Sequence, residues 1–138
     1  MRYYQGRLID HVHLRVRDFA RSADFYCAIF EALGIDGRAR LSRDWLELDE
    51  LFIDAADVDH PPSLVHLCFQ ASDRDAVDRF HAFGLNAGGR DNGKPGWRDY
   101  HPGYYAAFLL DPDGSNIEAK LDDRVTRRTS DAIGLDWD

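Results

Sequence analysis

Two stretches of the chain alternate apolar and polar residues, which is the pattern of a β-strand with one buried face. The first stretch ends at Val16 and the second at Gln70. Their apolar positions are Leu8, Val12, Leu14 and Val16 in the first stretch and Val65, Leu67 and Phe69 in the second. The pattern therefore predicts two strands whose other faces carry polar side chains, histidines among them.

A helix is predicted after each strand. Asp18 and Asp73 are suited to cap these helices, because a short side-chain oxygen can accept from the unpaired amides of the first turn. The predicted helices span about 19–33 and 74–84, and their stops are Gly34 and Gly84. Each stretch thus has the order strand, cap, helix.

The two stretches form an internal repeat with an offset of 55 residues, which aligns His11 with His66 and His13 with Cys68. Short strand-like pieces follow the first helix, at about 37–42, 44–49 and 51–56. After the second helix, residues 86–105 are rich in glycine and aromatic residues, and we expect a long functional loop there.

The end of the repeat predicts a β-hairpin. Apolar strands over 104–110 and 115–121 are joined by DPDG at 111–114, where proline fixes φ and glycine tolerates a positive φ. The chain is therefore predicted to be α+β. We expect one domain over 1–138, made of βαβββ modules at about 7–56 and 63–121, a linker at 57–62, and a tail at 122–138 whose Ile133, Leu135 and Trp137 dock on a second subunit or fray.

Composition narrows the partners. A chain of 138 residues that is 44% hydrophobic suits one packed domain. Its formal net charge of −8 repels polyanions, so we expect no nucleic-acid partner. No apolar run approaches the roughly 20 residues of a membrane span, and the N-terminus lacks the apolar core of a signal peptide, so a cytoplasmic protein with no membrane partner is expected. Cys27 and Cys68 are expected to be free thiols.

The same alternation places candidate metal ligands together. In the last strand Glu118 lies opposite the apolar face, as His11 and His66 do in the earlier strands. Two imidazoles and a carboxylate can bind a borderline divalent metal and leave positions for water or substrate. The competing interpretation is the solvated face of a sheet. The equivalent positions of the two histidines in the repeat favour the metal site.

Three motifs resemble the vicinal oxygen chelate superfamily, which includes glyoxalases, bleomycin resistance proteins and extradiol dioxygenases. They are IDHVHLRVRDFARSADFYCAIFEALG at 9–34, HLCFQASDRDAVDRFHAFG at 66–84 and YYAAFLLDPDGSNIEA at 104–119. The resemblance implies the glyoxalase/bleomycin resistance/dihydroxybiphenyl dioxygenase fold, in which paired βαβββ modules form an open, barrel-like cup around a metal. It also implies a homodimer.

The resemblance assigns the metal ligands to His11, His66 and Glu118. They would hold one divalent ion, which could be Zn, Ni, Mn, Co or Fe. A fourth ligand, present in glyoxalase I, falls near Asp54, which would reach the metal or its water or remain a solvated carboxylate. Whether the cup closes within one chain or across a dimer is left open by the sequence.

Further residues are expected to line the cup. His13 and Cys68 share strand faces with the predicted ligands. His13 would act as a general base or only bind substrate, whereas Cys68, although it shares the face of His66, is expected to be an inert small core residue. Arg98 would supply a forked donor to a carboxylate or phosphate, and Arg15 and Lys120 would add positive charge. The remaining substrate-binding candidates are Tyr100, Tyr104 and Phe108.

These residues predict a metal-dependent lyase or isomerase that chelates a small, oxygen-rich, anionic substrate through two oxygens. Glu118 would then also serve as a proton carrier. One alternative is an extradiol-type dioxygenase that uses Fe(II) with the same ligands. The other is a metal-free binder similar to the bleomycin-sequestering proteins. Retention of all three ligand types favours an enzyme.

Overall fold

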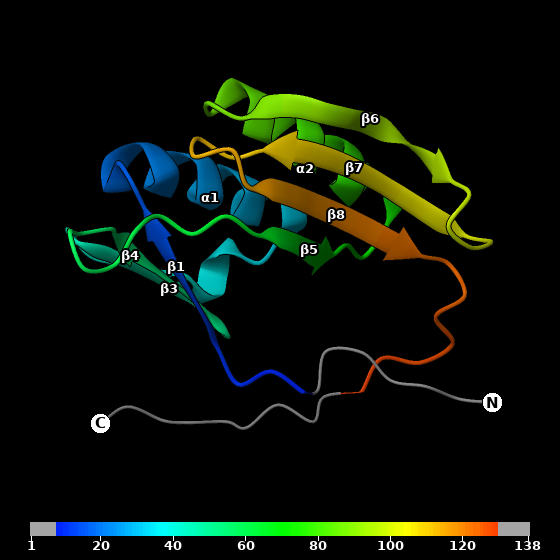
Figure 1. Cartoon of the computed structure of the whole chain (residues 1–138). Helices are drawn as coiled ribbons and strands as arrows, with labels where there is room; N and C mark the ends of the chain where they lie inside the picture. The colour runs from blue at the N-terminus through cyan, green and yellow to red at the C-terminus, as the bar shows by residue number, and fades with distance from the viewer. Residues whose placement is uncertain (1–7, 130–138) are drawn as a thin grey trace.

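Each half of the chain forms one four-stranded mixed sheet in the computed structural model, which describes residues 8–129 (Figure 1). The strands of the first sheet are β1 (Val12–Val16), β2 (Arg40–Leu41), β3 (Trp45–Leu48) and β4 (Leu51–Ala55). Those of the second are β5 (His66–Gln70), β6 (Arg90–Arg98), β7 (Tyr104–Leu110) and β8 (Asn116–Asp122).

The two sheets have the same topology. Their strand orders are β1-β4-β3-β2 and β5-β8-β7-β6, and the first strand of each runs parallel to its neighbour. The other neighbours pair antiparallel. The predicted α+β class and the repeat are therefore confirmed. The two sheets are not closed into a barrel.

Two helices join the strands as predicted. Helix α1 spans Phe19–Leu33 and helix α2 spans Arg74–Asn86, and a short 3₁₀ helix, η1, covers Asp36–Arg38. Asp18 accepts a hydrogen bond from the Arg21 amide at 3.1 Å, and Asp73 accepts one from the Ala76 amide at 2.7 Å. Gly34 ends α1 in the left-handed conformation, with φ of 73°.

The core lies where α1 and α2 pack against each other and against one face of each sheet. Figure 1 shows α2 behind the second sheet, so the open face of that sheet is turned toward the viewer. The alternation determines which side chains are buried: Leu109 and Ile117 face the helices and are fully buried. Along each strand, the residues that alternate with the buried ones lie on the open face of the sheet. This face carries the candidate site.

The first strand is shorter than the alternation predicts. Strand β1 begins at Val12, and the side chain of Leu8 is 92% exposed. The reason is the length of the neighbouring strand. Val12 pairs with Leu51, the first residue of β4, so earlier residues have no paired strand residue beside them. His11 therefore lies just outside the sheet.

The predicted loop over 86–105 is wrong for much of its length. Residues 90–98 form β6, an edge strand paired with β7. Its glycines sit at irregularities in the pairing, between Asp91 and Gly93 and between Gly93 and Gly96. An edge strand tolerates such bulges and a proline, because one side of its backbone needs no partner.

Gly84 does not end α2, which continues to Asn86. A Cβ atom at Gly84 would lie 2.2 Å from Leu109 Cδ1 and 3.2 Å from Ile29 Cγ2. This glycine thus allows α2 to pack closely on β7 and α1, which is a different use of glycine from chain termination.

Replacing Gly84 with alanine should therefore destabilise the fold by about 2 kcal/mol, because the added methyl overpacks a closed core. Gly37→Ala is the matched control, since a Cβ at Gly37 meets nothing within 4 Å and should leave the stability nearly unchanged. Urea unfolding of both variants measures the difference. Equal stability of the two variants would contradict this packing argument.

No helix in the described part of the chain is long and apolar enough to cross a membrane. The predicted docking residues of the tail, Ile133, Leu135 and Trp137, lie outside the described residues.

Candidate functional site

The open face of the second sheet gathers most of the predicted site residues. In the sheet register Cys68 lies beside Glu118, and Glu118 lies beside Phe108 on β7. His66 precedes Cys68 by two residues and shares its face. Its imidazole ring lies 6.2 Å from the Phe108 ring, centroid to centroid. The strand alternation therefore does bring these side chains to one surface.

Glu118 is the buried acid of this surface, with 2% exposure. His66 Nε2 lies 3.0 Å from Glu118 Oε1, and the Tyr104 hydroxyl donates to Oε2. Within residues 8–129, no Lys or Arg nitrogen lies within 4.0 Å of this carboxylate. A buried carboxylate without a cationic partner is costly, so its surroundings favour a cation.

The neighbours of Glu118 stay protonated at neutral pH. Burial, and then the hydrogen bond to Glu118, raise the pKa of Tyr104 above its ordinary value. Burial, and then the charge of Glu118, raise the pKa of the Cys68 thiol to about 12. Both groups are thus neutral donors beside a carboxylate. A thiol in this state is a poor nucleophile, as predicted, but Cys68 lies on the exposed face of β5 and not in the core, because Leu67 and Phe69 take the inward positions of this strand.

The first sheet carries a second pair of a histidine and a carboxylate. His13 Nε2 lies 2.8 Å from Asp54 Oδ1, and Arg15 Nε lies 3.9 Å from the same oxygen. The pair forms because β1 runs parallel to β4, with Asp54 opposite Arg15 in the register. The Phe52 ring packs edge-on against the imidazole at 5.0 Å.

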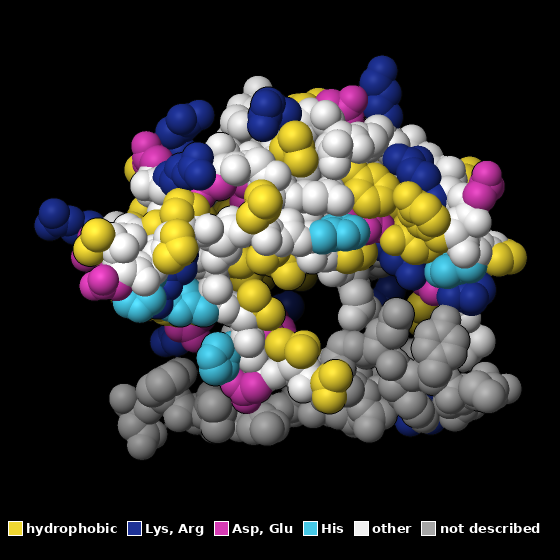
Figure 2. Space-filling model, viewed as in Figure 1, with side chains coloured by type: hydrophobic (Ala, Val, Ile, Leu, Met, Phe, Trp, Pro, Cys, Tyr) yellow, Lys and Arg dark blue, Asp and Glu magenta, His cyan; other side chains and the backbone are white. Residues whose placement is uncertain are grey.

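His11 does not join either pair. Its Nδ1 lies 2.7 Å from Asp10 Oδ1, and its side chain is 70% exposed. Within residues 8–129, no group of three or more His, Cys, Asp or Glu side chains is close enough to hold a metal ion. Figure 2 likewise shows histidines in separate places on one face of the molecule. A single chain thus brings together His66 and Glu118 but not the full predicted set.

Two of the cations predicted for the cup lie beside aspartates. Arg15 lies 3.9 Å from Asp54 and 4.0 Å from Asp57, and Lys120 Nζ lies 3.6 Å from Asp122. These two cations are neutralised, so the expected contribution of Arg15 and Lys120 to a positive cup is wrong. Each sits on a face shared with a carboxylate, which strand alternation alone does not reveal.

Arg98 and Tyr100 border the second sheet. The Arg98 guanidinium carbon lies 5.4 Å above the Phe108 ring, and Nη2 donates to the Lys94 carbonyl at 2.6 Å. Tyr100 is 68% exposed and packs edge-on against Tyr104, with the ring centroids 5.0 Å apart. Both therefore lie beside the surface that holds Glu118.

An ionic cluster at the end of β8 was not predicted. Arg124 donates to both carboxylate oxygens of Asp122, at 3.0 and 2.9 Å, and His101 Nε2 lies 3.5 Å from Asp122. The amide of Asp123 also donates to the Gly103 carbonyl at 3.0 Å. The cluster fixes the turn between β6 and β7 beside Tyr104. The two-residue spacing of Glu118, Lys120 and Asp122 was its signal in the sequence.

Because of this cluster, part of the folding stability should depend on pH. Hydrogen bonds from Arg124 hold the pKa of Asp122 well below its ordinary value. A lowered folded-state pKa stabilises above the unfolded pKa near 4, and the stabilisation is lost as the pH falls through the folded value. The melting temperature of the wild type should therefore exceed that of Asp122→Asn at pH 7, and the gap should shrink below about pH 4.

The control for this comparison is Asp99→Asn. Asp99 is exposed, and within the described residues it forms no ion pair, so its replacement should change the melting temperature little at either pH. A gap between wild type and Asp122→Asn that stays constant from pH 7 down to about pH 3 would exclude the proposed ionisation effect.

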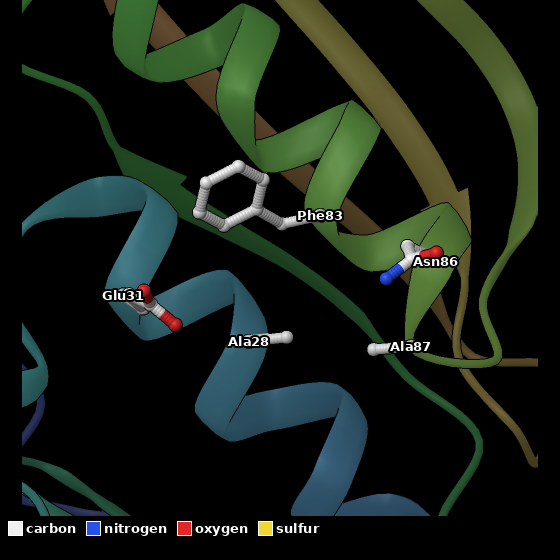
Figure 3. Close-up of a pocket in the computed structure, with 5 residues that line it drawn as sticks. All are labelled: Ala28, Glu31, Phe83, Asn86 and Ala87. Carbon is white, nitrogen blue, oxygen red and sulfur yellow. The ribbon is translucent and has the colours of Figure 1, made fainter.

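A small cleft on the opposite side of the molecule lies between the helices (Figure 3). It has a volume of about 370 Å³ and is lined by Ala28, Glu31, Phe83, Asn86 and Ala87. None of the predicted site residues lines it. The candidate chemistry therefore belongs to the sheet faces and not to this helical cleft.

Comparison with known proteins agrees with the fold. No family model matches the chain, and no curated protein matches it by sequence. A solved structure of a glyoxalase/bleomycin resistance protein from Albidiferax ferrireducens is 31% identical, with a TM-score of 0.71, and the match covers 83% of this chain and 98% of that one.

Two more distant structures show the same fold. A glyoxalase/bleomycin resistance protein/dioxygenase family enzyme from Burkholderia phytofirmans is 20% identical with a TM-score of 0.61, covering 82% of this chain and 97% of that one. A lactoylglutathione lyase from Agrobacterium tumefaciens is 18% identical with a TM-score of 0.59, covering 89% and 99%.

Proposed function

Because the chain belongs to the glyoxalase/bleomycin resistance protein family of the vicinal oxygen chelate superfamily, we propose that it is a metal-dependent lyase or isomerase. The observation that carries this proposal is the buried Glu118 carboxylate, which His66 faces and no Lys or Arg of the described residues neutralises. Its substrate would be a small, oxygen-rich molecule that is held through two oxygens. The expected metal is one divalent ion per site.

The donor pair of the second sheet fits such an ion. Zinc, for example, would bind nitrogen and oxygen ligands at about 2.0–2.2 Å, so two ligand atoms of one ion would lie roughly 3 Å apart. His66 Nε2 and Glu118 Oε1 are 3.0 Å apart, close to that separation. Tyr104 occupies the other carboxylate oxygen, as outer partners of metal ligands commonly do. His66 and Glu118 would serve as two of the ion's ligands.

A second copy of the chain would supply a further ligand. His11 lies just before the first sheet with its Nε2 unpaired among residues 8–129, and it does not meet Glu118 within one chain. We therefore propose a homodimer in which His11 of one copy completes the site of His66 and Glu118 in the other. Asp54, the partner of His13 on the first sheet, would contact the metal or its water.

When bound, the metal would polarise the two chelated oxygens and acidify the neighbouring C–H bond. His13 would accept that proton. Because Asp54 is a carboxylate, His13 Nε2 carries the hydrogen between them, which leaves Nδ1 as the basic nitrogen. Asp54 would also stabilise the imidazolium that forms. Glu118 is the second candidate proton carrier, because a carboxylate that binds the metal could also exchange with the substrate.

Elemental analysis of the purified protein tests this proposal. The wild type should contain a divalent metal, and His66→Ala should lose most of it, because one of its ligands is missing. His60→Ala is the control: His60 is exposed and bonds to Asp57, outside both sheets. A metal-free wild type would instead favour the binding-protein alternative, and iron with oxygen consumption would favour the dioxygenase.

A further inference from the structure

The arginine at the end of β6 lies in a space that two glycines keep open. A Cβ atom at Gly96 would lie 3.1 Å from Arg98 Nη1, and one at Gly93 would lie 3.2 Å from Nη2. The guanidinium is thus folded back along its own strand, over positions where any other residue would crowd it. The bulges of β6 occur at these glycines.

Arg98 has no counter-ion within residues 8–129. No carboxylate oxygen of these residues lies within 4.0 Å of its guanidinium, although the chain carries a net charge of −8. Arg15, Lys120 and Arg124, the other cations near the two sheet faces, each lie beside an aspartate. Of the five guanidinium N–H groups, one donates to the Lys94 carbonyl.

The position of this cation relates it to Glu118. The guanidinium lies over one side of the Phe108 ring, and His66 packs near the same ring. Phe108 is also the register neighbour of Glu118. A ligand with one end at His66 and Glu118 would therefore extend across a single aromatic ring to reach Arg98.

We propose that Arg98, held in its glycine-lined space, is the subsite for the anionic end of the substrate, a carboxylate or phosphate. The proposal rests on the proposed function for the other end of the substrate. An unpaired, half-buried guanidinium over an apolar ring gives a carboxylate or phosphate a forked, poorly hydrated partner. The glycines leave room for the guanidinium, and its hydrogen bond to the Lys94 carbonyl holds the fork in this position.

Anion titration of the full chain tests the subsite without a known substrate. Inorganic phosphate and acetate serve as separate probes of the two anion classes, and the Nε–H NMR signal of Arg98, assigned by its loss in Arg98→Met, reports binding. The wild type should show a saturable shift with at least one probe. Gly96→Ala keeps the charge but crowds Nη1, so it should weaken binding about tenfold.

Arg90→Met is the control for the loss of one positive charge from β6, because Arg90 is exposed at the end of the strand opposite to Arg98. This variant should bind the anion as the wild type does. Equal weakening in Arg90→Met and Gly96→Ala, or no saturable shift in the wild type, would overturn the subsite. Repeating the titration after chelator treatment separates the two proposals. Anion binding at Arg98 should be unchanged when the metal is removed, and the metal content of the purified protein tests the proposed function independently.

Discussion

Asp111→Ala should lower the free energy of unfolding by about 4 kcal/mol, a large share of the stability of a domain this size. The Asp111 side chain is buried and accepts three hydrogen bonds. Oδ1 accepts from the amides of Asp113 and Ser115, both at 2.9 Å, and Oδ2 accepts from the Tyr26 hydroxyl at 2.6 Å. Alanine would leave the Tyr26 hydroxyl and the Ser115 amide unpaired and buried, and the part-buried Asp113 amide would also lose its acceptor.

The bond from Tyr26 connects the two halves of the chain, whereas the two amide bonds lie within one turn. Tyr26 belongs to α1 of the first half, whereas Asp111 begins the turn between β7 and β8 of the second. Burial, and then the charge of Asp111, raise the pKa of Tyr26 well above its ordinary value, so the phenol remains a donor at all ordinary pH values. The carboxylate therefore stabilises the turn and the contact between modules together.

Tyr26→Phe is the matched comparison, because it removes one donor and keeps the carboxylate and its two backbone bonds. It should cost about 2 kcal/mol, clearly less than Asp111→Ala. Urea unfolding followed by circular dichroism measures both variants, and the double variant measures their coupling. If Asp111→Ala cost no more than Tyr26→Phe, the turn amides would not depend on this carboxylate.

Strand faces were predictable because a period of two leaves few alternatives. Leu14 and Ile117 are buried as the alternation requires, and Glu118 lies on the opposite face of β8 from Ile117. Contacts between particular residues of one module were harder to predict from the sequence. That His13 meets Asp54 depends on β1 running parallel to β4, and this register is determined by the packing of the whole module.

Glycine produced the main errors, because its sequence signal has several physical causes. Gly34 ends a helix, Gly84 permits close packing inside one, and Gly96 leaves room for a guanidinium within a strand. Each use depends on neighbours that are distant in sequence, such as Leu109 for Gly84. The arrangement of the candidate site was unpredictable for a similar reason. Alternation tells on which face of a strand a residue lies, but it does not tell how the two sheets are positioned relative to each other.

Two inactive variants should restore metal binding to each other when they share a dimer. In the proposed homodimer, each site combines His11 of one copy with His66 and Glu118 of the other. His11→Ala and His66→Ala should each lose most of their metal, and both folds should survive, since these side chains are 70% and 52% exposed. A mixed dimer has one site with both substitutions and one site with neither.

The reciprocal mixture makes this prediction decisive. When the double variant His11→Ala/His66→Ala is paired with the wild type, a site shared between copies is broken on both sides, so this mixed dimer should hold no metal. A site formed within one chain gives the opposite result in both experiments, because the wild-type chain then keeps its own complete site. Purifying each mixed dimer through two different affinity tags and measuring metal per dimer therefore tests both arrangements. A chain that stays monomeric in solution yet holds its metal would also exclude sharing, because no second copy is then present to supply His11.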